Sequence, residues 1–170
     1  MLLIYTRLSQ IRFGQLMQVY EEGAVENGAE FYPDLSPNEQ ILRAEQDFYA
    51  YLQSGFFIQD EDRYCIWEEN GRYVCALRLE KYQDGLLLEA LETHPSYRRR
   101  GYAKKLIQSV FEELKPNRVY SHIGHKNIAS QATHIACGFQ KVSDSARYAD
   151  GSVNDRCGTY LYEAKNASLS

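Results

Sequence analysis

The pattern of apolar positions predicts a strand and a helix at the start of the chain. Residues 1–5 are a continuous apolar run, which is typical of a buried strand. Apolar residues then recur with helical spacing over 13–24, so we expect a helix there. Turn-forming residues are frequent at 27–35 and predict a loop after this helix.

A second helix has its own start and stop signals. Ser36 is a good N-cap residue, Pro37 suits the first helical position, and Glu39 completes a capping box. The apolar helical spacing continues to Leu52, and Gly55 can end the helix. We therefore expect a helix between these signals.

The middle of the chain changes to strand-like runs. We expect strands at 64–67, 73–79 and 87–93. Asn-Gly at 70–71 and Asp-Gly at 84–85 are hairpin turn signals between them. Three consecutive antiparallel strands are therefore predicted.

The last part of the chain alternates helices and strands. Residues 103–114 carry an amphipathic helical pattern that ends before Pro116. The remaining predicted elements are a strand at 118–123, a helix at 127–137, strands at 139–142 and 159–163, and a polar stretch at 143–158 between those two strands. This order predicts one mixed α/β (α+β) domain over 1–170, with a polar tail from about residue 165.

Composition is that of an ordinary globular protein, with 170 residues, 44% hydrophobic and 25% charged. No apolar run is long enough to span a bilayer, and the start lacks the pattern of a signal peptide. The four cysteines show no CxxC spacing, so we expect reduced thiols in a cytoplasmic protein. A net charge of −4 argues against a nucleic-acid partner.

One dense basic segment stands out in this acidic chain. Five of the eight residues at 98–105 are Arg or Lys, and they lie where a predicted strand runs directly into a helix. Gly101 and the small Ala103 allow a ligand to approach the backbone closely. Because a helix N-terminus also attracts anions, the segment suits a diphosphate. The alternative is a helix-capping loop with solvated arginines.

The same segment resembles the signature of the GNAT superfamily of acyl-CoA-dependent N-acetyltransferases. The family pattern Arg/Gln-x-x-Gly-x-Gly/Ala is matched by 98–103, and the preceding 91–95 is similar to the family's strand end. Thr93 stands where the family usually has Val. Five residues of this chain resemble a second motif of the family, with His134 in place of the usual Tyr. They are Asn127, Ser130, His134, Gly138 and Phe139.

The resemblance implies a fold and a set of cofactor contacts. The fold would be a mixed, mostly antiparallel sheet of about six to seven strands flanked by about four helices. Acetyl-CoA would be the co-substrate. The implied contacts are Leu91, Glu92 and Thr93 beside the pantetheine arm, Arg98, Arg99, Arg100, Gly101, Tyr102, Ala103 and Lys104 around the diphosphate, and Asn127 near the pantetheine.

Amine acetylation needs a group that takes a proton from the attacking ammonium. Glu89 is our candidate, because family members often carry Glu or His at this place. We expect it on the same strand face as Leu87, Leu91 and Thr93. The alternative is a strand carboxylate that faces solvent or pairs with a neighbouring Arg. Glu92, expected on the opposite face, is a second candidate.

His134 is the candidate for giving a proton to the departing thiolate. Asn127, Ser130 and His134 form one stripe of the predicted helix, and the apolar Ile128 and Ile135 lie on the other. His134 should then face the cofactor if Asn127 does. The alternatives are a helix histidine without chemistry, or Tyr148 or Tyr160 in this role.

The sequence therefore predicts an N-acetyltransferase in which a primary amine attacks acetyl-CoA directly in a ternary complex. One alternative is a catalytically silent relative that binds CoA as a regulatory module. Another is an unrelated mononucleotide-binding domain, although no P-loop lysine accompanies the glycines. No HExxH spacing suggests a metal. The acceptor amine and the oligomeric state stay open, with a homodimer as one alternative.

Four acidic residues on the first helix and the loop after it suggest a preference for a cationic amine. Glu21, Glu22, Glu26 and Glu30 would give the acceptor side an acidic lip. A solvated helix face explains them equally well.

Overall fold

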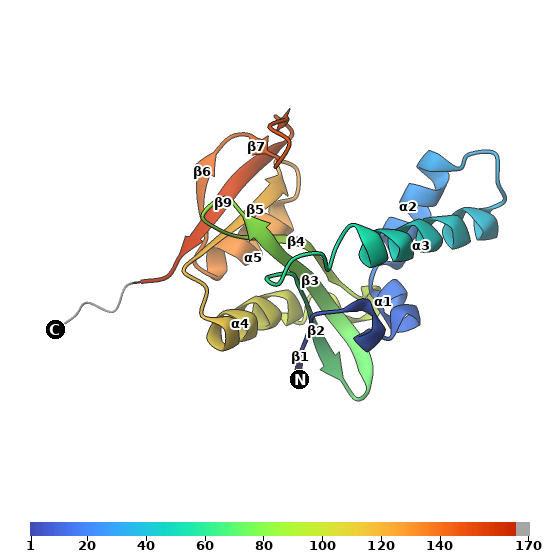
Figure 1. Cartoon of the computed structure of the whole chain (residues 1–170), viewed down its shortest axis with the longest axis horizontal. Coiled ribbons are helices and arrows are strands. Elements are labelled where there is room, and N and C mark those ends of the chain that lie inside the picture. The colour runs from blue at the N-terminus through green and yellow to red at the C-terminus, as the bar shows by residue number, and fades with distance from the viewer. Residues whose placement is uncertain (166–170) are drawn as a thin grey trace.

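A computed structural model describes residues 1–165 of the chain, and the expected polar tail lies outside these residues apart from its first position. One strand and three helices precede a three-stranded meander, and helices then alternate with strands (Figure 1). The α-helices are α1 (Phe13–Val19), α2 (Glu21–Phe31), α3 (Pro37–Ser54), α4 (Tyr102–Leu114) and α5 (Ile128–Ala136). The strands are β1 (Leu2–Tyr5), β2 (Arg63–Glu69), β3 (Arg72–Tyr82), β4 (Gly85–Thr93), β5 (Arg118–Gly124), β6 (Gln140–Ser143), β7 (Ala146–Arg147), β8 (Val153–Asn154) and β9 (Cys157–Glu163).

Seven strands form one sheet in the order β1-β2-β3-β4-β5-β9-β6, which confirms the expected mixed α/β fold. Its neighbouring strands are antiparallel except for the central pair, β4 and β5, which are parallel. These two strands pair only at Leu86 with Val119 and at Leu87 with Tyr120. Beyond Leu87 they diverge, so the middle of the sheet opens toward the end of β4.

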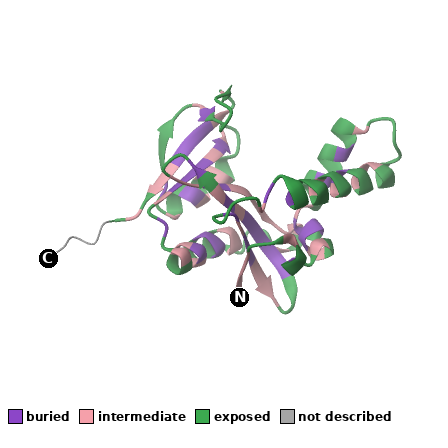
Figure 2. Cartoon of the chain, viewed as in Figure 1, coloured by how far each residue is buried: buried purple, intermediate pink, exposed green. Residues whose placement is uncertain are grey.

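The helices cover the two faces of the sheet over different strands. Leu106 and Ile107 of α4 are buried in a core cluster on one face. Leu16 of α1 and Leu52 of α3 are buried in a second cluster on the other face. Figure 2 shows the buried residues concentrated along the sheet, whereas the hairpin of α2 and α3 extends away from it and is mostly exposed.

The extent predicted for the first helix is wrong. Instead of one helix over 13–24, α1 and α2 meet at Tyr20, which raises the number of helices from the expected four to five. The loop predicted at 27–35 is helical as far as Phe31. Gly28 misled the prediction because it serves helix packing: an added Cβ would lie 2.5 Å from the carbonyl oxygen of Gln40 in α3.

Gly71 and Gly85 have different roles in the two hairpins of the meander. The turn at 70–71 is confirmed, and both of its residues have positive φ. The second turn lies one residue earlier than predicted, at 83–84, with Gln83 at a φ of 48°. Gly85 instead begins β4, where an added Cβ would lie 2.4 Å from the carbonyl oxygen of Arg118. This glycine therefore permits the close approach of β4 and β5.

The polar stretch at 143–158, for which the sequence predicted no helix or strand, contains β7 and β8. These strands form a short antiparallel ribbon separate from the main sheet. The hydroxyl of Tyr82 in β3 donates to the carbonyl oxygen of Arg147, which ties the ribbon to the sheet.

None of the helices within residues 1–165 is long and apolar enough to cross a membrane.

Candidate active site

The loop between β4 and α4 contains two residues with unusual backbone conformations. Arg99 and Gly101 have left-handed backbone conformations, with φ values of 61° and 77°. Such residues turn successive N–H groups toward one point, where they can bind an anion. Gly101 is also the N-cap of α4, and no side chain caps the first N–H groups of that helix. The loop therefore has the backbone geometry of an anion site.

The basic side chains of the loop divide into two groups. Arg98 donates to both carboxylate oxygens of Glu22 in α2, at 2.9 and 2.8 Å, and also to Glu92 at 3.2 Å. These contacts fasten the loop to α2. Arg99, Arg100 and Lys104 form no ion pair within the described residues. Arg99 and Lys104 line a cavity of about 430 Å³ beside the loop, whereas the Arg100 guanidinium lies over the ring of Tyr97, 5.4 Å from its centroid.

A bulge in β4 shapes the next part of the site. Ala90 has a φ of 52°, which is rare for a residue other than glycine and strains the backbone. Its carbonyl oxygen accepts a hydrogen bond of 2.6 Å from the hydroxyl of Tyr20, at the junction of α1 and α2. The pairing of β3 with β4 shifts by one residue at this point. A contact from the helical layer therefore holds the bulge in place.

The bulge makes our expectation about strand faces wrong. Leu87 packs with Tyr82 and Tyr120 on the face that carries Glu89, whereas Leu91 packs against the α4 core on the opposite face. Thr93 is also on the α4 side, where its Oγ1 lies 3.4 Å from Cys75 Sγ. The side chains of β4 do not alternate strictly between the two faces of the sheet, because the bulge adds one residue to the strand.

Glu92 was expected opposite Glu89, but it shares the face of Glu89. The two glutamates pair with Ala76 and Arg78, which are alternate residues of β3 and point to one side. Glu92 is bonded to Arg98, so its carboxylate lies beside the basic loop.

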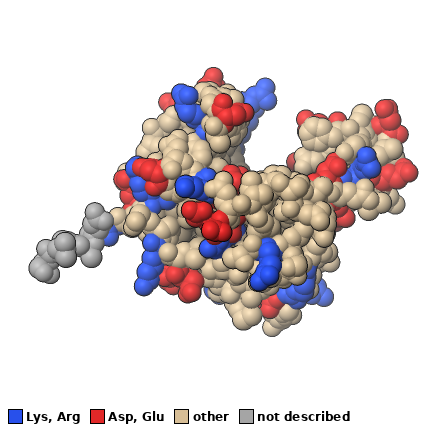
Figure 3. All heavy atoms as spheres, in the orientation of Figure 1, with Lys and Arg blue, Asp and Glu red and all other residues tan. Residues whose placement is uncertain are grey.

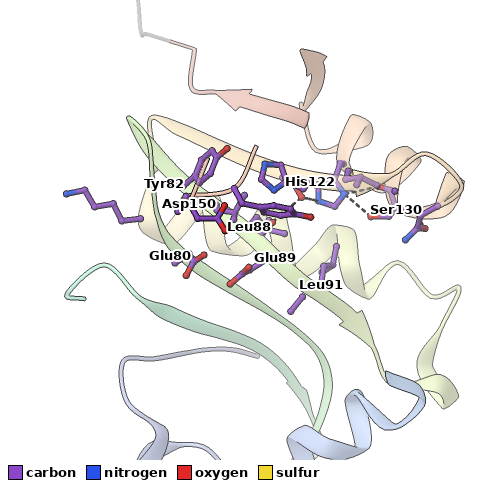
Figure 4. A pocket seen from close by; sticks show the side chains of 18 of the residues that line it. Glu80, Tyr82, Leu88, Glu89, Leu91, His122, Ser130 and Asp150 are labelled. Carbon is purple, nitrogen blue, oxygen red and sulfur yellow. Dashed lines mark hydrogen bonds between the residues drawn. The ribbon is translucent and has the colours of Figure 1, made fainter. Parts of the chain in front are cut away.

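A central cavity of about 910 Å³ lies where β4 and β5 diverge (Figure 4). It has Leu91, Asn127 and Ser130 in common with the smaller cavity beside the basic loop, so the two adjoin. Ser130 and His134 line it from α5, and Glu80 and Glu89 line it from β3 and β4. The cavity therefore connects the loop with the face of the sheet that carries the carboxylates.

Glu89 pairs with an arginine, one of the alternatives considered from the sequence. The Nε of Arg78 lies 3.3 Å from the Glu89 carboxylate. The Arg78 guanidinium is half-enclosed by the rings of Phe48, Tyr51 and Phe56, each 5.2–5.7 Å away. Burial alone would lower the pKa of Arg78, but nearby Tyr64 and Glu89 raise it overall. Glu89 therefore borders the cavity beside a permanent positive charge.

The structure adds a second carboxylate that the sequence analysis missed. Glu80 in β3 is half-buried in the central cavity, and burial, with the nearby charge of Glu89, raises its pKa to about 7. Figure 4 shows both glutamates projecting from neighbouring strands on the same side. The sequence does contain a signal for this carboxylate, because Arg78 and Glu80 alternate with apolar residues at the end of a strand that is otherwise buried.

His134 is buried at the cavity wall, with an exposed fraction of 1%. Its Nδ1 lies 2.8 Å from the carbonyl oxygen of Ser130, so this nitrogen carries the proton and donates. The hydroxyl of Ser121 lies 3.1 Å from both the Nε2 and the carbonyl oxygen of Leu88, and its single proton can serve only one of these two acceptors at a time. Burial lowers the pKa of His134, and the ring is neutral at neutral pH. The histidine is therefore not a free proton donor in this arrangement.

The orientation of α5 is the one expected from its stripes. Asn127 caps the helix by accepting from the N–H of Ser130 at 3.1 Å, and both residues line the central cavity. Ile128 and Ile135 on the other stripe are 66% and 58% exposed. The polar stripe of α5 thus faces inward.

The two tyrosines proposed as alternatives to His134 differ in access. Tyr160 is 4% exposed and belongs to the apolar core, whereas Tyr148 lines the central cavity.

Across residues 1–165, no three His, Cys, Asp or Glu side chains are grouped as metal ligands would be.

The acidic lip on the α2–α3 hairpin does not line the central cavity. Figure 3 shows acidic side chains gathered on this hairpin, where Glu21, Glu22, Glu26 and Glu30 are all exposed. Of these, Glu22 pairs with Arg98. A smaller cavity of about 290 Å³ between the hairpin and Arg78 shares Tyr51 with the central cavity, and its lining is mainly apolar.

The splayed central strands, the bulge and the uncapped helix define an acetyltransferase fold. The family model of the Acetyltransferase (GNAT) family matches residues 16–139. The chain therefore belongs to the GNAT acetyltransferase family. Among curated proteins, no sequence matches it.

Solved structures share this fold at low sequence identity. The ribosomal-protein-S18-alanine N-acetyltransferase of Escherichia coli has 15% identity and a TM-score of 0.61, covering 100% of this chain and 99% of that one. The PaiA N-acetyltransferase of Thermoplasma acidophilum, in complex with coenzyme A, has 11% identity and a TM-score of 0.63, covering 96% and 99%. An acetyltransferase of Streptococcus agalactiae has 18% identity and a TM-score of 0.64, covering 96% and 98%.

Proposed function

We propose that this protein transfers an acetyl group from acetyl-CoA to a primary amine, which attacks directly while both substrates are bound. The observation that carries the proposal is the course of the two adjoining cavities. They begin at the basic loop, pass between β4 and β5, and end at the carboxylates of Glu80 and Glu89. A diphosphate at one end and an amine at the other would bring their reacting atoms together in the sheet opening.

In this proposal the backbone of residues 99–104 holds the diphosphate of acetyl-CoA, which supplies the activated thioester. Arg99, Arg100 and Lys104 add positive charge. The side chain of Arg98 has a different role, because it ties the loop to Glu22. The end of β4, from Leu91 to Thr93 with Glu92 between them, is not paired with β5 and offers a strand edge to the pantetheine arm, with Asn127 nearby.

Glu89 accepts the proton of the attacking ammonium, directly or through a water molecule. The amine nitrogen then forms a bond to the acetyl carbonyl carbon and gives up its second proton to water, and the carbon–sulfur bond breaks to release the thiolate. The oxyanion that develops between these events needs a hydrogen-bond donor, for which a backbone N–H of β4 near the bulge is suitable. Arg78 keeps Glu89 in place and offsets its charge.

His134 has a positioning role in this proposal. Because its Nδ1 proton is engaged with Ser130, it orders the hydroxyls of Ser121 and Ser130 at the wall of the cavity. A thiolate is a stable leaving group and can take its proton from solvent. A catalytically silent CoA-binding relative is the second candidate, favoured by the absence of the family Tyr at 134. Binding of CoA without acetyl transfer to any amine would support that candidate.

The test of the cofactor site uses two matched glycines. Gly101→Asn keeps a residue type that tolerates a left-handed backbone, and a Cβ added at this position meets no described atom within 4 Å. It would nevertheless occupy the concavity of the loop, so we expect CoA affinity to fall at least about tenfold by calorimetry. The control is Gly71→Asn, which has the same kind of backbone and open space in a distant turn. Equal CoA affinity of the two folded variants would overturn the assignment.

A further inference from the structure

The end of the central cavity away from the basic loop carries polar and aromatic groups that acetyl transfer itself does not require. Glu80 and Tyr82 come from β3, His122 from β5, and Tyr148 and Asp150 from the connection between β7 and β8 (Figure 4). These residues come from three separate parts of the chain. They form a wall that only the acceptor would contact.

The carboxylates of this wall have no partner among the basic side chains. Glu89 is paired with Arg78, but Glu80 and Asp150 join no ion pair with any residue from 1 to 165. Asp150 is exposed at the rim and stays charged, since hydrogen bonds from Ser152 lower its pKa. Burial makes the ionised form of Glu80 costly, and a cation in the cavity would offset that cost. The wall therefore carries two carboxylates that are paired with no cation of the described residues, while Lys81 also lines the cavity.

The rings beside these carboxylates also suit a cation. The ring of His122 lies 5.4 Å from that of Tyr82 and 5.6 Å from that of Tyr148, and it is nearly perpendicular to both. Burial lowers the pKa of His122, so the ring adds no positive charge to the wall. Its Nε2 is buried without a hydrogen-bond partner among residues 1–165. Aromatic faces attract ammonium groups, most strongly where water is partly excluded.

We propose that the acceptor is a small primary amine with a second positive charge, which Glu80, Asp150 and the surrounding rings hold at the far end of the cavity. This inference rests on the proposed acetyl transfer, because it places the reacting nitrogen near Glu89. The wall selects against an amine that carries a carboxylate at its far end.

The spacing of the two glutamates supports a short diamine. Glu80 pairs with Leu87, and Glu89 is two residues further along β4, so the two glutamates are diagonal neighbours on one face. Diagonal neighbours on adjacent strands lie about 7–8 Å apart. A short alkyl chain between two nitrogens spans such a distance. One ammonium can therefore lie by Glu80 while the other nitrogen is by Glu89.

The test compares three acceptors of similar length by release of free thiol from acetyl-CoA. The probes are butane-1,4-diamine, pentan-1-amine and 4-aminobutanoate. We expect kcat/KM for the diamine to exceed that for the monoamine by about 10- to 100-fold, the range for one charge-assisted contact. Glu80→Gln should remove this preference by raising KM for the diamine while kcat is kept. Asp150→Asn should have a smaller effect, because its side chain is exposed.

The control is Glu113→Gln, which removes an exposed carboxylate of α4 on the other face of the sheet. It should leave all three acceptors unchanged. Equal kcat/KM for diamine and monoamine in the wild type would overturn the inference. So would a loss of kcat for every amine in Glu80→Gln, which would make Glu80 a proton acceptor. If no amine is acetylated, the proposed function fails, and calorimetric binding of the diamine with and without Glu80→Gln still decides the inference.

Discussion

Replacing Glu80 with Gln should make the protein more stable at alkaline pH and leave its stability unchanged in acid. Glu80 is half-buried beside Glu89 and forms no ion pair with the rest of the described chain. Its pKa is raised from 4.5 to about 7 by burial and, to a lesser extent, by the charge of Glu89. A raised carboxyl pKa means that the folded protein holds the proton more tightly than the unfolded chain. The contribution to stability is therefore present below about pH 4.5 and is lost as pH rises through about 7.

The size of the effect follows from the two pKa values. Each unit of pKa difference corresponds to about 1.36 kcal/mol, so the full difference would be about 3 kcal/mol. Solvent reaches about half of the Glu80 environment and screens the charge, which reduces the expected gain to about 1–2 kcal/mol. Gln has the shape of the protonated acid and cannot ionise, so Glu80→Gln should show this gain in full above about pH 8.

Urea unfolding, followed by circular dichroism at several pH values, measures the effect. The free energies of unfolding of the variant and the wild type should coincide near pH 4.5 and separate progressively toward pH 9. Glu113→Gln serves as the control and should show no pH-dependent difference. A difference that is constant with pH, or a variant less stable than the wild type at pH 9, would refute the argument. The same substitution is expected to weaken diamine binding, so stability and acceptor recognition should change in opposite directions.

Three further outcomes are expected. Glu89→Gln should slow acetyl transfer at neutral pH while CoA binding persists, and the loss should shrink as pH rises and more amine is free; equal activity at all pH values would remove Glu89 from the mechanism. His134→Gln should keep the shape of the pH–rate profile, whereas loss of its alkaline limb would make His134 a proton donor. Gly85→Ala should cost about 1–3 kcal/mol in urea unfolding because it separates β4 from β5, and Gly14→Ala, with open space around it, should not destabilise α1.

The elements that the sequence predicted well depend on contacts between near neighbours. The helix at 37–54 begins with the capping box expected from Ser36 and Glu39, because both hydrogen bonds lie within four residues. The basic loop also followed from local signals, since its charge, its glycine and the start of α4 are contiguous. The resemblance carried by that loop agreed with the family match.

The parts that were predicted wrongly depend on partners far along the chain. The helix break at Tyr20 accompanies a hydrogen bond to Ala90, which lies 70 residues away. That bond holds the bulge that turns Leu91 to the other face of the sheet, and no periodicity within β4 reports it. Gly28 similarly reads as a loop residue until its contact with α3 is known.

Apart from the junction of α1 with α2 and the β7–β8 ribbon, the sequence by itself determined the order of the elements, the basic loop and the candidates Glu89 and His134. Only the tertiary structure decided what surrounds them. Arg78 meets Glu89, and Glu80 becomes half-buried beside it, because β3 and β4 pair in one register. His134 is neutral and engaged because α5 turns its polar stripe toward Ser121 of β5. A side chain's charge and reactivity follow from its burial and partners, and these are fixed by strand pairing and helix docking rather than by local pattern.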